Sequence, residues 1–210
     1  MRSMMKSIRT AVLAASLLLA ASPAYAAGAF GIELGEHICT YAPAAEAVFT
    51  RHELKMYELV PPQADARFDT YAVDTHNGRI IRIMASSADD RTPGGEHSLA
   101  VLDSLQQELI ARYGTPSLSM GEIADAGDEL LAHLVDEGGL EVLEWDFLEK
   151  RVDGLGAVYV FLAGAEDEKG GQASYCTLYL ESPDYAELSE AARLHEAVRE
   201  EEQAGSAVQQ

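Results

Sequence analysis

The 210-residue chain contains only two cysteines, one tryptophan and 15 basic residues. So few cysteines exclude a small scaffold held together by several disulfides. The basic residues are outnumbered by 35 acidic residues, and the resulting net charge of −20 at pH 7 excludes nucleic acid as a partner, because its phosphates would be repelled. Hydrophobic residues still make up 48% of the chain, which is the composition of an ordinary globular protein.

Several motifs of catalysis and cofactor binding are also missing. The chain has no G-K-S/T phosphate loop, no G-x-S-x-G nucleophile motif and no H-E-x-x-H zinc motif. The early glycines Gly28, Gly31 and Gly35 do not have the spacing of a dinucleotide-binding turn. We therefore predict no catalytic residue, no metal ligand and no cofactor.

No hydrophobic run reaches the roughly 20 residues that a membrane-spanning helix needs. The run at residues 11–21 follows three basic residues and precedes Ala24-Tyr25-Ala26, a small-x-small sequence. This order is typical of a secretory signal peptide, here residues 1–26. We expect a periplasmic or extracellular protein without a stable membrane anchor. The signal segment has three basic and no acidic residues, so its removal changes the net charge from −20 to −23.

Cys39 and Cys176 would be the only two thiols of the exported chain. In an oxidising compartment an even number of cysteines usually indicates a disulfide, so we predict a Cys39–Cys176 bridge. A redox-active pair is the weaker alternative, because exchange catalysts use two cysteines close together in the sequence.

The order of the expected elements predicts an α+β fold with an antiparallel sheet meander packed against helices. Residues 27–203 form a single domain with possible halves 27–116 and 117–203, and residues 204–210 form a disordered tail. Alternating apolar residues and an Asn-Gly turn predict the strands, at 55–60, 68–73, 79–85, 141–148, 155–162 and 173–180. Helical spacing and end signals predict the helices, at 43–52, 99–113, 119–137 and 183–198. The resulting order raises the hypothesis of a duplicated helix, three strands and helix unit.

Two groups of residues are candidates for a binding surface. The first is acidic, because residues 113–149 contain no lysine or arginine while Glu122, Asp125, Asp128 and Glu129 lie close together. Such a region would attract a cationic ligand, although a merely solvated surface has the same composition. The second group is Tyr159, Tyr175 and Tyr179, which share one face of two neighbouring strands. Exposed tyrosines often anchor a protein partner, whereas buried ones would pack under a helix.

Four short segments carry a resemblance. They are the sequence Phe-Gly-Ile-Glu-Leu-Gly at 30–35, residues 57–62, residues 68–73, and residues 105–116, which end in Tyr-Gly-Thr-Pro. Together they resemble a group of uncharacterised secreted proteobacterial proteins with the same beginning and the same Y-G-x-P close. The resemblance covers the first half of the mature chain and implies no particular chemistry.

Three functions are compatible with this sequence. The first is a non-enzymatic binding or accessory protein with an acidic surface, whose partner is an envelope protein or a cationic ligand. The second is a carboxylate-based hydrolase of the cell envelope. This alternative stays open because 35 acidic residues will always include some pair at the separation that glycoside hydrolysis requires. The third is a structural component of an envelope assembly. The sequence makes no prediction of the oligomeric state.

Overall fold

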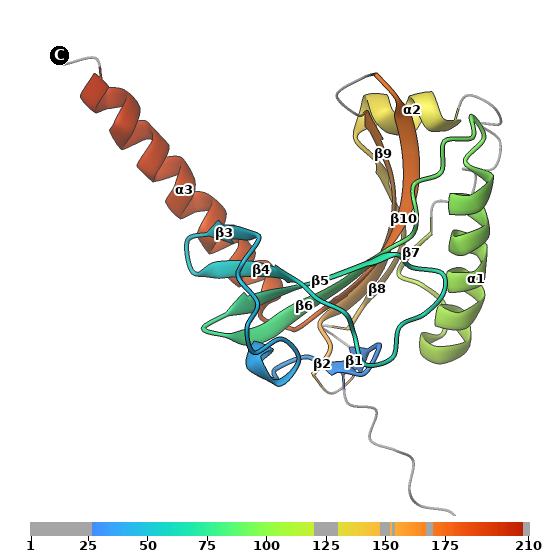
Figure 1. The fold of residues 1–210 in the computed structure, drawn as a ribbon, viewed down its shortest axis with the longest axis horizontal. Helices are drawn as coiled ribbons and strands as arrows, with labels where there is room; N and C mark the ends of the chain where they lie inside the picture. Colours follow the sequence, from blue (N-terminus) through green and yellow to red (C-terminus); the bar gives the residue numbers. More distant parts are fainter. Residues whose placement is uncertain (1–26, 120–129, 148–151, 153, 167–169, 208–210) are drawn as a thin grey trace, which may run out of the picture.

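A computed structural model describes residues 27–119, 130–147, 152, 154–166 and 170–207. Within these residues the chain forms three α-helices, a two-stranded sheet and an eight-stranded antiparallel sheet (Figure 1). The expected α+β fold is therefore confirmed.

The large sheet is one continuous surface built from two meanders. The first meander contains β3 (Phe49–Arg51), β4 (Leu54–Glu58), β5 (Thr70–His76) and β6 (Arg79–Ser86). The second contains β7 (Leu118–Ser119), β8 (Leu140–Asp146), β9 (Ala157–Glu166) and β10 (Gln172–Glu181). The strand order is β3-β4-β5-β6-β10-β9-β8-β7, so the last strands of the two meanders pair with each other. The pairing of β6 with β10 thus joins the two halves of the chain.

The two faces of this sheet differ in composition, because successive side chains of a strand point to opposite sides. On one face, which we call the core face, Val73, Ile83, Leu180, Val158 and Trp145 form a row across β5, β6, β10, β9 and β8. All five side chains are buried. Each large apolar side chain buried in this way contributes about 1.5–3 kcal/mol. The core face is therefore the main source of hydrophobic stabilisation.

Helix α1 (Glu96–Tyr113) contributes Val101, Leu102, Leu105 and Leu109 to the core that covers this face. Leu102, Leu105 and Leu109 recur at steps of three and four, as the sequence predicted, and Val101 lies one helical turn before Leu105. Helix α2 (Leu130–Glu137) lies on the same side, where Gly164 leaves room for Leu134. The short strands β1 (Gly28–Ala29) and β2 (Ile32–Glu33) complete the cover, with Ile32 buried in the core.

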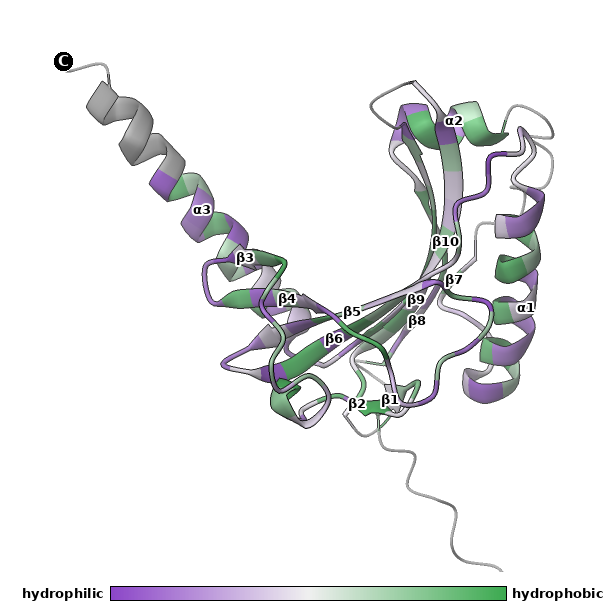
Figure 2. Cartoon of the chain, in the orientation of Figure 1, coloured by the Kyte–Doolittle hydropathy of each residue, from purple (hydrophilic) through white to green (hydrophobic). Residues whose placement is uncertain are grey.

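The other face, which we call the open face, carries polar and aromatic side chains. Helix α3 (Tyr185–Ala207) begins on this side and then leaves the body of the molecule (Figures 1 and 2). Its Tyr185 is buried, whereas Leu194 and Val198 further along the helix are exposed. Only the first part of α3 therefore depends on packing against the sheet.

Local signals in the sequence account for the turn between β5 and β6. Asn77 and Gly78 both have positive φ angles, of 51° and 76°, which is the backbone of the tight turn that Asn-Gly favours. Gly78 also lies against His37, and a Cβ atom at this position would overlap the imidazole ring. His37 itself accepts the backbone N–H of Cys39 and caps a 3₁₀ helix, η1 (Ile38–Thr40).

Several expected boundaries differ from the structure. Residues 43–52 do not form a helix, because Phe49 and Arg51 pair with β4 and cross-strand packing outweighs the alanine content of this segment. Only the second part of the helix expected at 119–137 is described, as α2, and residues 120–129 lie outside the described residues. Helix α3 continues past residue 198 to Ala207, into the segment that we expected to be a disordered tail. Because the first half lacks an initial α-helix, the repeated unit is at most a meander followed by a helix.

The expected disulfide is not formed, and both cysteines are free thiols. Cys39 is exposed beside the β5–β6 turn, where Ile38 N–H donates to Gly78 O. Cys176 is buried in β10, where its N–H donates to Ser87 Oγ just beyond the far end of β6. The length of β6, at about 3.3 Å per residue, thus separates the two cysteines. A disulfide requires Cα atoms within about 7 Å, so this fold cannot bridge them without rearrangement.

We predict that a thiol reagent modifies one cysteine of the native protein and two after denaturation. Cys39 should react first because it is exposed, whereas burial raises the pKa of the Cys176 thiol to about 12 and shields it. The measurement is a colorimetric thiol titration with and without denaturant. Cys39→Ser should abolish the native reaction, and failure of the denatured protein to react at all would reveal a disulfide.

A buried carboxylate caps α1 from outside the helix. Asp90 Oδ2 accepts the backbone N–H groups of His97 (2.6 Å) and Ser98 (3.2 Å), while Oδ1 accepts the N–H and hydroxyl of Thr92. Burial alone would raise the pKa of Asp90, but these hydrogen bonds lower it below its ordinary value. Asp90 therefore performs the role of an N-cap, since Gly95 at the cap position has no side chain.

We predict that Asp90→Asn lowers the free energy of unfolding by about 1–3 kcal/mol at neutral pH, because it removes a charged acceptor from buried donors. The pKa of Asp90 is lowered in the folded state, so its stabilisation is present above the unfolded pKa, about 3.9, and is lost as the pH falls through the folded pKa. Urea unfolding at several pH values would measure this. The control is Asp89→Asn at the exposed neighbouring position, and equal effects of the two substitutions would contradict the assignment.

Candidate functional site

The structure brings the three predicted tyrosines to the open face of β9 and β10. Tyr159 and Tyr179 are direct cross-strand partners, and their rings stack with centroids 4.7 Å apart. Tyr175 lies on the same face opposite Ala163. Phe161, opposite Thr177, is a fourth aromatic ring on this face that the sequence analysis did not single out. We call these four half-buried side chains, Tyr159, Phe161, Tyr175 and Tyr179, the tyrosine face.

A buried ion cluster supports one end of the tyrosine face. Arg82 Nη2 lies 2.6 Å from Asp74 Oδ2, and Arg82 Nη1 lies 3.8 Å from Glu181 Oε1. The guanidinium carbon also lies over two rings, at 4.4 Å from the Tyr185 centroid and 5.3 Å from the Tyr179 centroid. Arg82 thus connects β5, β6, β10 and the start of α3.

The tyrosines around this cluster stay protonated, mainly because they are buried. Burial would lower the pKa of Arg82, but the charge of Asp74 raises it above the ordinary value. Burial raises the pKa of Tyr185 to about 12, and burial together with Glu181 raises the pKa of Tyr159 further. Tyr159 donates its hydroxyl to Glu181 Oε1 at 2.8 Å. These tyrosines are therefore neutral donors at physiological pH and cannot act as general bases there.

The other end of the tyrosine face differs because α3 has left the sheet before reaching it (Figure 1). Among the described residues, α1 and α2 lie on the core side, so neither helix covers Phe161 or Tyr175. Phe161 instead packs over Gly139, whose φ of 116° and lack of a Cβ allow the ring to lie against the backbone. This end therefore presents aromatic rings that are only partly covered by the protein itself.

Carboxylates border the tyrosine face along β8. Glu144 is the cross-strand partner of Tyr159, and Asp146 continues the same side of β8. The four acidic residues singled out from the sequence, Glu122, Asp125, Asp128 and Glu129, lie outside the described residues. Within the acidic region, Glu144 and Asp146 thus lie beside the tyrosines, whereas Asp136 and Glu137 lie on α2 on the core side. This arrangement depends on the register of the sheet and cannot be inferred from sequence spacing.

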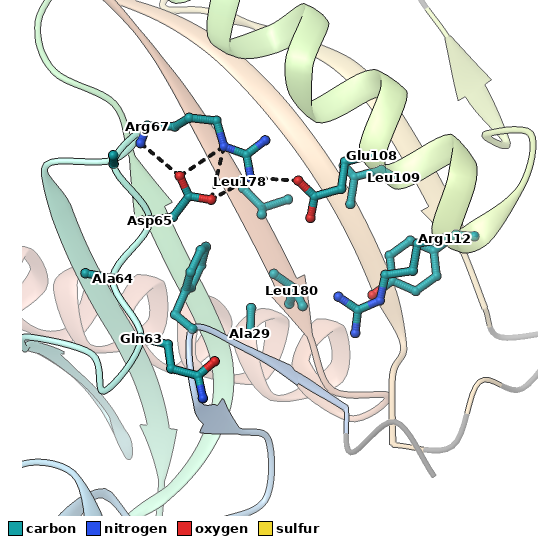
Figure 3. Close-up of a pocket in the computed structure, with 13 residues that line it drawn as sticks. Ala29, Gln63, Ala64, Asp65, Arg67, Glu108, Leu109, Arg112, Leu178 and Leu180 are labelled. Carbon is teal, nitrogen blue, oxygen red and sulfur yellow. Dashed lines mark hydrogen bonds and ion pairs between the residues drawn. The ribbon is translucent and has the colours of Figure 1, made fainter. Parts of the chain in front are cut away.

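A cavity of about 420 Å³ lies on the core side, between α1, residues 63–67 and the β1–β2 turn (Figure 3). Leu178 and Leu180 of β10 form its floor, so β10 contributes to both candidate sites. This cavity was not predicted from the sequence, because its lining comes from four separate segments. The nearest signal is the spacing of Asp65 and Arg67 in a polar segment before β5.

Asp65 and Glu108 are two carboxylates of the cavity wall, and both bind Arg67. Arg67 Nη2 lies 2.6 Å from Asp65 Oδ2 and 2.7 Å from Glu108 Oε2, while Arg67 Nη1 donates to Ser104 Oγ at 3.1 Å. The hydrogen bonds from Arg67 lower the pKa of Asp65, so this carboxylate stays ionised and is a poor proton donor at neutral pH. Arg67 thus latches residues 63–67 to α1. Because Asp65 and Glu108 both bind this arginine, the two carboxylates do not have the arrangement of a catalytic acid and base.

Comparison with known proteins gives no relative: no family model, no curated protein and no solved structure matches the chain. Among the described residues, no helix has both the length and the hydrophobicity needed to cross a membrane. The described residues also contain no group of three or more potential metal ligands. The tyrosine face and the cavity are therefore the two features of the described residues that bear on function.

We predict that Arg82→Gln lowers the free energy of unfolding by about 3–5 kcal/mol, because it leaves Asp74 and Glu181 buried without their cation. Denaturant unfolding would measure the change. The control is Arg193→Gln, which removes an exposed pair with Glu190 on α3 and should change stability little. Similar losses in the two variants would show that the cluster does not hold the sheet and α3 together.

Proposed function

We propose that this protein is a non-enzymatic binding protein of the cell envelope, periplasmic or extracellular, and that the tyrosine face takes a cationic segment of a partner protein. The observation that carries the proposal is a partly covered row of aromatic rings bordered by carboxylates. Aromatic rings attract cations through their negative faces, and carboxylates add a longer-range attraction. Lysine and arginine side chains fit both features.

The protein contains an internal example of the proposed contact. Arg82 lies over the rings of Tyr179 and Tyr185 and binds carboxylates with its terminal nitrogens. A partner's arginine over Tyr175 would repeat this arrangement at the less covered end of the same face. The stacked Tyr159–Tyr179 pair is already engaged by the cluster, so Tyr175 and Phe161 are the rings on which the proposal depends most.

The overall charge supports the same partner. After removal of residues 1–26 the chain would carry −23, a charge that speeds the approach of a cationic protein and disfavours an acidic one. Secretion itself is inferred from the order of basic, apolar and small residues in that segment. The hydrolase alternative receives less support, since Asp65 and Glu108 are both held by Arg67.

We predict that a fluorescent oligoarginine peptide binds the protein and that Tyr175→Ala weakens binding by about twofold to tenfold at physiological salt. High salt screens the long-range attraction more than a contact over a ring, so the effect of Tyr175→Ala should persist as salt is raised. Fluorescence anisotropy would give the dissociation constants.

Tyr175→Phe is the matched control, because it keeps the ring and should retain most of the affinity. An oligoglutamate peptide should not bind. Equal affinities for Tyr175→Ala and the unmodified protein would contradict the proposal and reduce the interaction to general charge attraction.

A further inference from the structure

The cavity beneath α1 lies on the opposite side of the sheet from the tyrosine face and has a different chemistry. Its volume of about 420 Å³ is within the usual range of small-molecule sites, about 300–1,000 Å³. Leu178 and Leu180 of β10 supply an apolar floor, and Leu109 of α1 adds an apolar wall (Figure 3). The hydrophobic part of a small molecule would therefore be covered by two elements of the fold.

Two aromatic rings also line the cavity, Phe30 of the β1–β2 turn and Tyr113 at the end of α1. Each of them packs against a further ring of the protein. Phe30 meets Tyr71 edge-to-face, with centroids 5.1 Å apart and ring planes at 71°. Tyr113 meets Phe147 in the same way, at 5.3 Å and 61°. These contacts fix the two lining rings in place, so both walls are formed before a ligand arrives, which lowers the entropic cost of binding.

The β1–β2 turn holds Phe30 at the cavity in a strained backbone conformation. Phe30 has a φ of 58°, which a bulky side chain rarely adopts, and Gly31 follows with a φ of 74°. The carbonyl of Phe30 accepts the N–H of Gln63 at 2.9 Å, so the turn is tied to the neighbouring wall of the cavity. A strained residue persists where the surrounding structure fixes it, and such residues cluster at ligand sites.

The cavity has charged side chains but no net charge. Two carboxylates and two guanidinium groups belong to its lining: Asp65, Glu108, Arg67 and Arg112. Arg67 binds both carboxylates, at 2.6 Å from Asp65 and 2.7 Å from Glu108. A charged ligand would have to leave water for a lining with no net opposite charge, whereas a neutral ligand has no such cost. The lining therefore favours a neutral molecule.

We propose that this cavity binds a neutral, planar aromatic molecule, which lies on the leucine floor and contacts the rings of Phe30 and Tyr113. Aromatic rings attract one another in edge-to-face and offset arrangements, and this attraction adds to the effect of the buried area. A saturated molecule of the same size would fill the space without that contribution. The side-chain amide of Gln63, an exposed residue of the lining, can donate and accept hydrogen bonds, so one polar substituent is compatible with the site.

The test uses four probes that share one carbon skeleton: 2-naphthol, its saturated counterpart decahydro-2-naphthol, and the charged 2-naphthoate and 2-naphthylmethylamine. Calorimetric titration of the full mature chain should give the highest affinity for 2-naphthol. Phe30→Leu keeps an apolar side chain but removes a ring. It should lower the affinity for 2-naphthol by about twofold to tenfold and leave that for decahydro-2-naphthol almost unchanged.

A second variant does not disturb the core contacts of Phe30. Ala64→Trp places a large ring at an exposed position of the cavity lining and should abolish measurable binding of both neutral probes. The matched control is Ala197→Trp at an exposed position of α3, which should leave their binding unchanged. Ala64→Trp should also leave oligoarginine binding at the tyrosine face unchanged, so the two proposals can fail separately.

Four results would overturn the proposal. One is no measurable binding of 2-naphthol to the unmodified protein. Another is equal affinity for 2-naphthol and decahydro-2-naphthol, which would mean that the rings of the lining do not recognise the ligand. The third is a preference for either charged probe, which would assign recognition to the charged side chains. The fourth is an unchanged 2-naphthol affinity in Ala64→Trp, which would place the binding site elsewhere.

Discussion

A single guanidinium buried among carboxylates and aromatic rings holds together the parts of this fold that are most distant in sequence. Arg82 lies on β6, at the junction where the first meander pairs with the second. Its partners are Asp74 of β5, Glu181 of β10 and Tyr185 of α3. Removal of the charge from water is costly, and the contacts from these elements offset that cost. The cluster therefore forms only when the strands are in register and α3 has docked.

The continuous sheet explains why the molecule has two unlike surfaces. Because side chains alternate along each strand, a row such as Val73, Ile83, Leu180 and Val158 fills the core, while the row Met84, Tyr179, Tyr159 and Glu144 lies on the open side. Helices α1 and α2 cover the first surface. Helix α3 covers only one end of the second, and Phe161 and Tyr175 are left partly covered. The candidate interface thus follows from an imbalance in the number of helices on the two sides.

Features that depend on neighbouring residues were predictable from the sequence, and features that depend on tertiary contacts were not. The Asn77-Gly78 turn, the apolar stripe of α1 and the shared face of Tyr159, Tyr175 and Tyr179 were all expected and are all present. The segment 43–52 was expected to be helical because of its alanines, yet its pairing with β4 decides its structure. The disulfide was inferred from the number of cysteines, which contains no information about the strand that separates them. The cavity is lined by four separate segments, so no single stretch of sequence describes it.

Strand β10 links the two candidate sites through its alternation. Leu178 and Leu180 form the floor of the cavity, and Tyr179 between them belongs to the tyrosine face. Each site is also bordered by an arginine bound to two carboxylates, Arg67 on the core side and Arg82 on the open side. These clusters fix the walls of the sites independently, because they share no residue. A ligand on one face could affect the other only by displacing β10 itself, and the hydrogen-bonded partners on both sides of this strand, β6 and β9, resist such a displacement. The fold therefore favours two sites that act separately, although they share a strand.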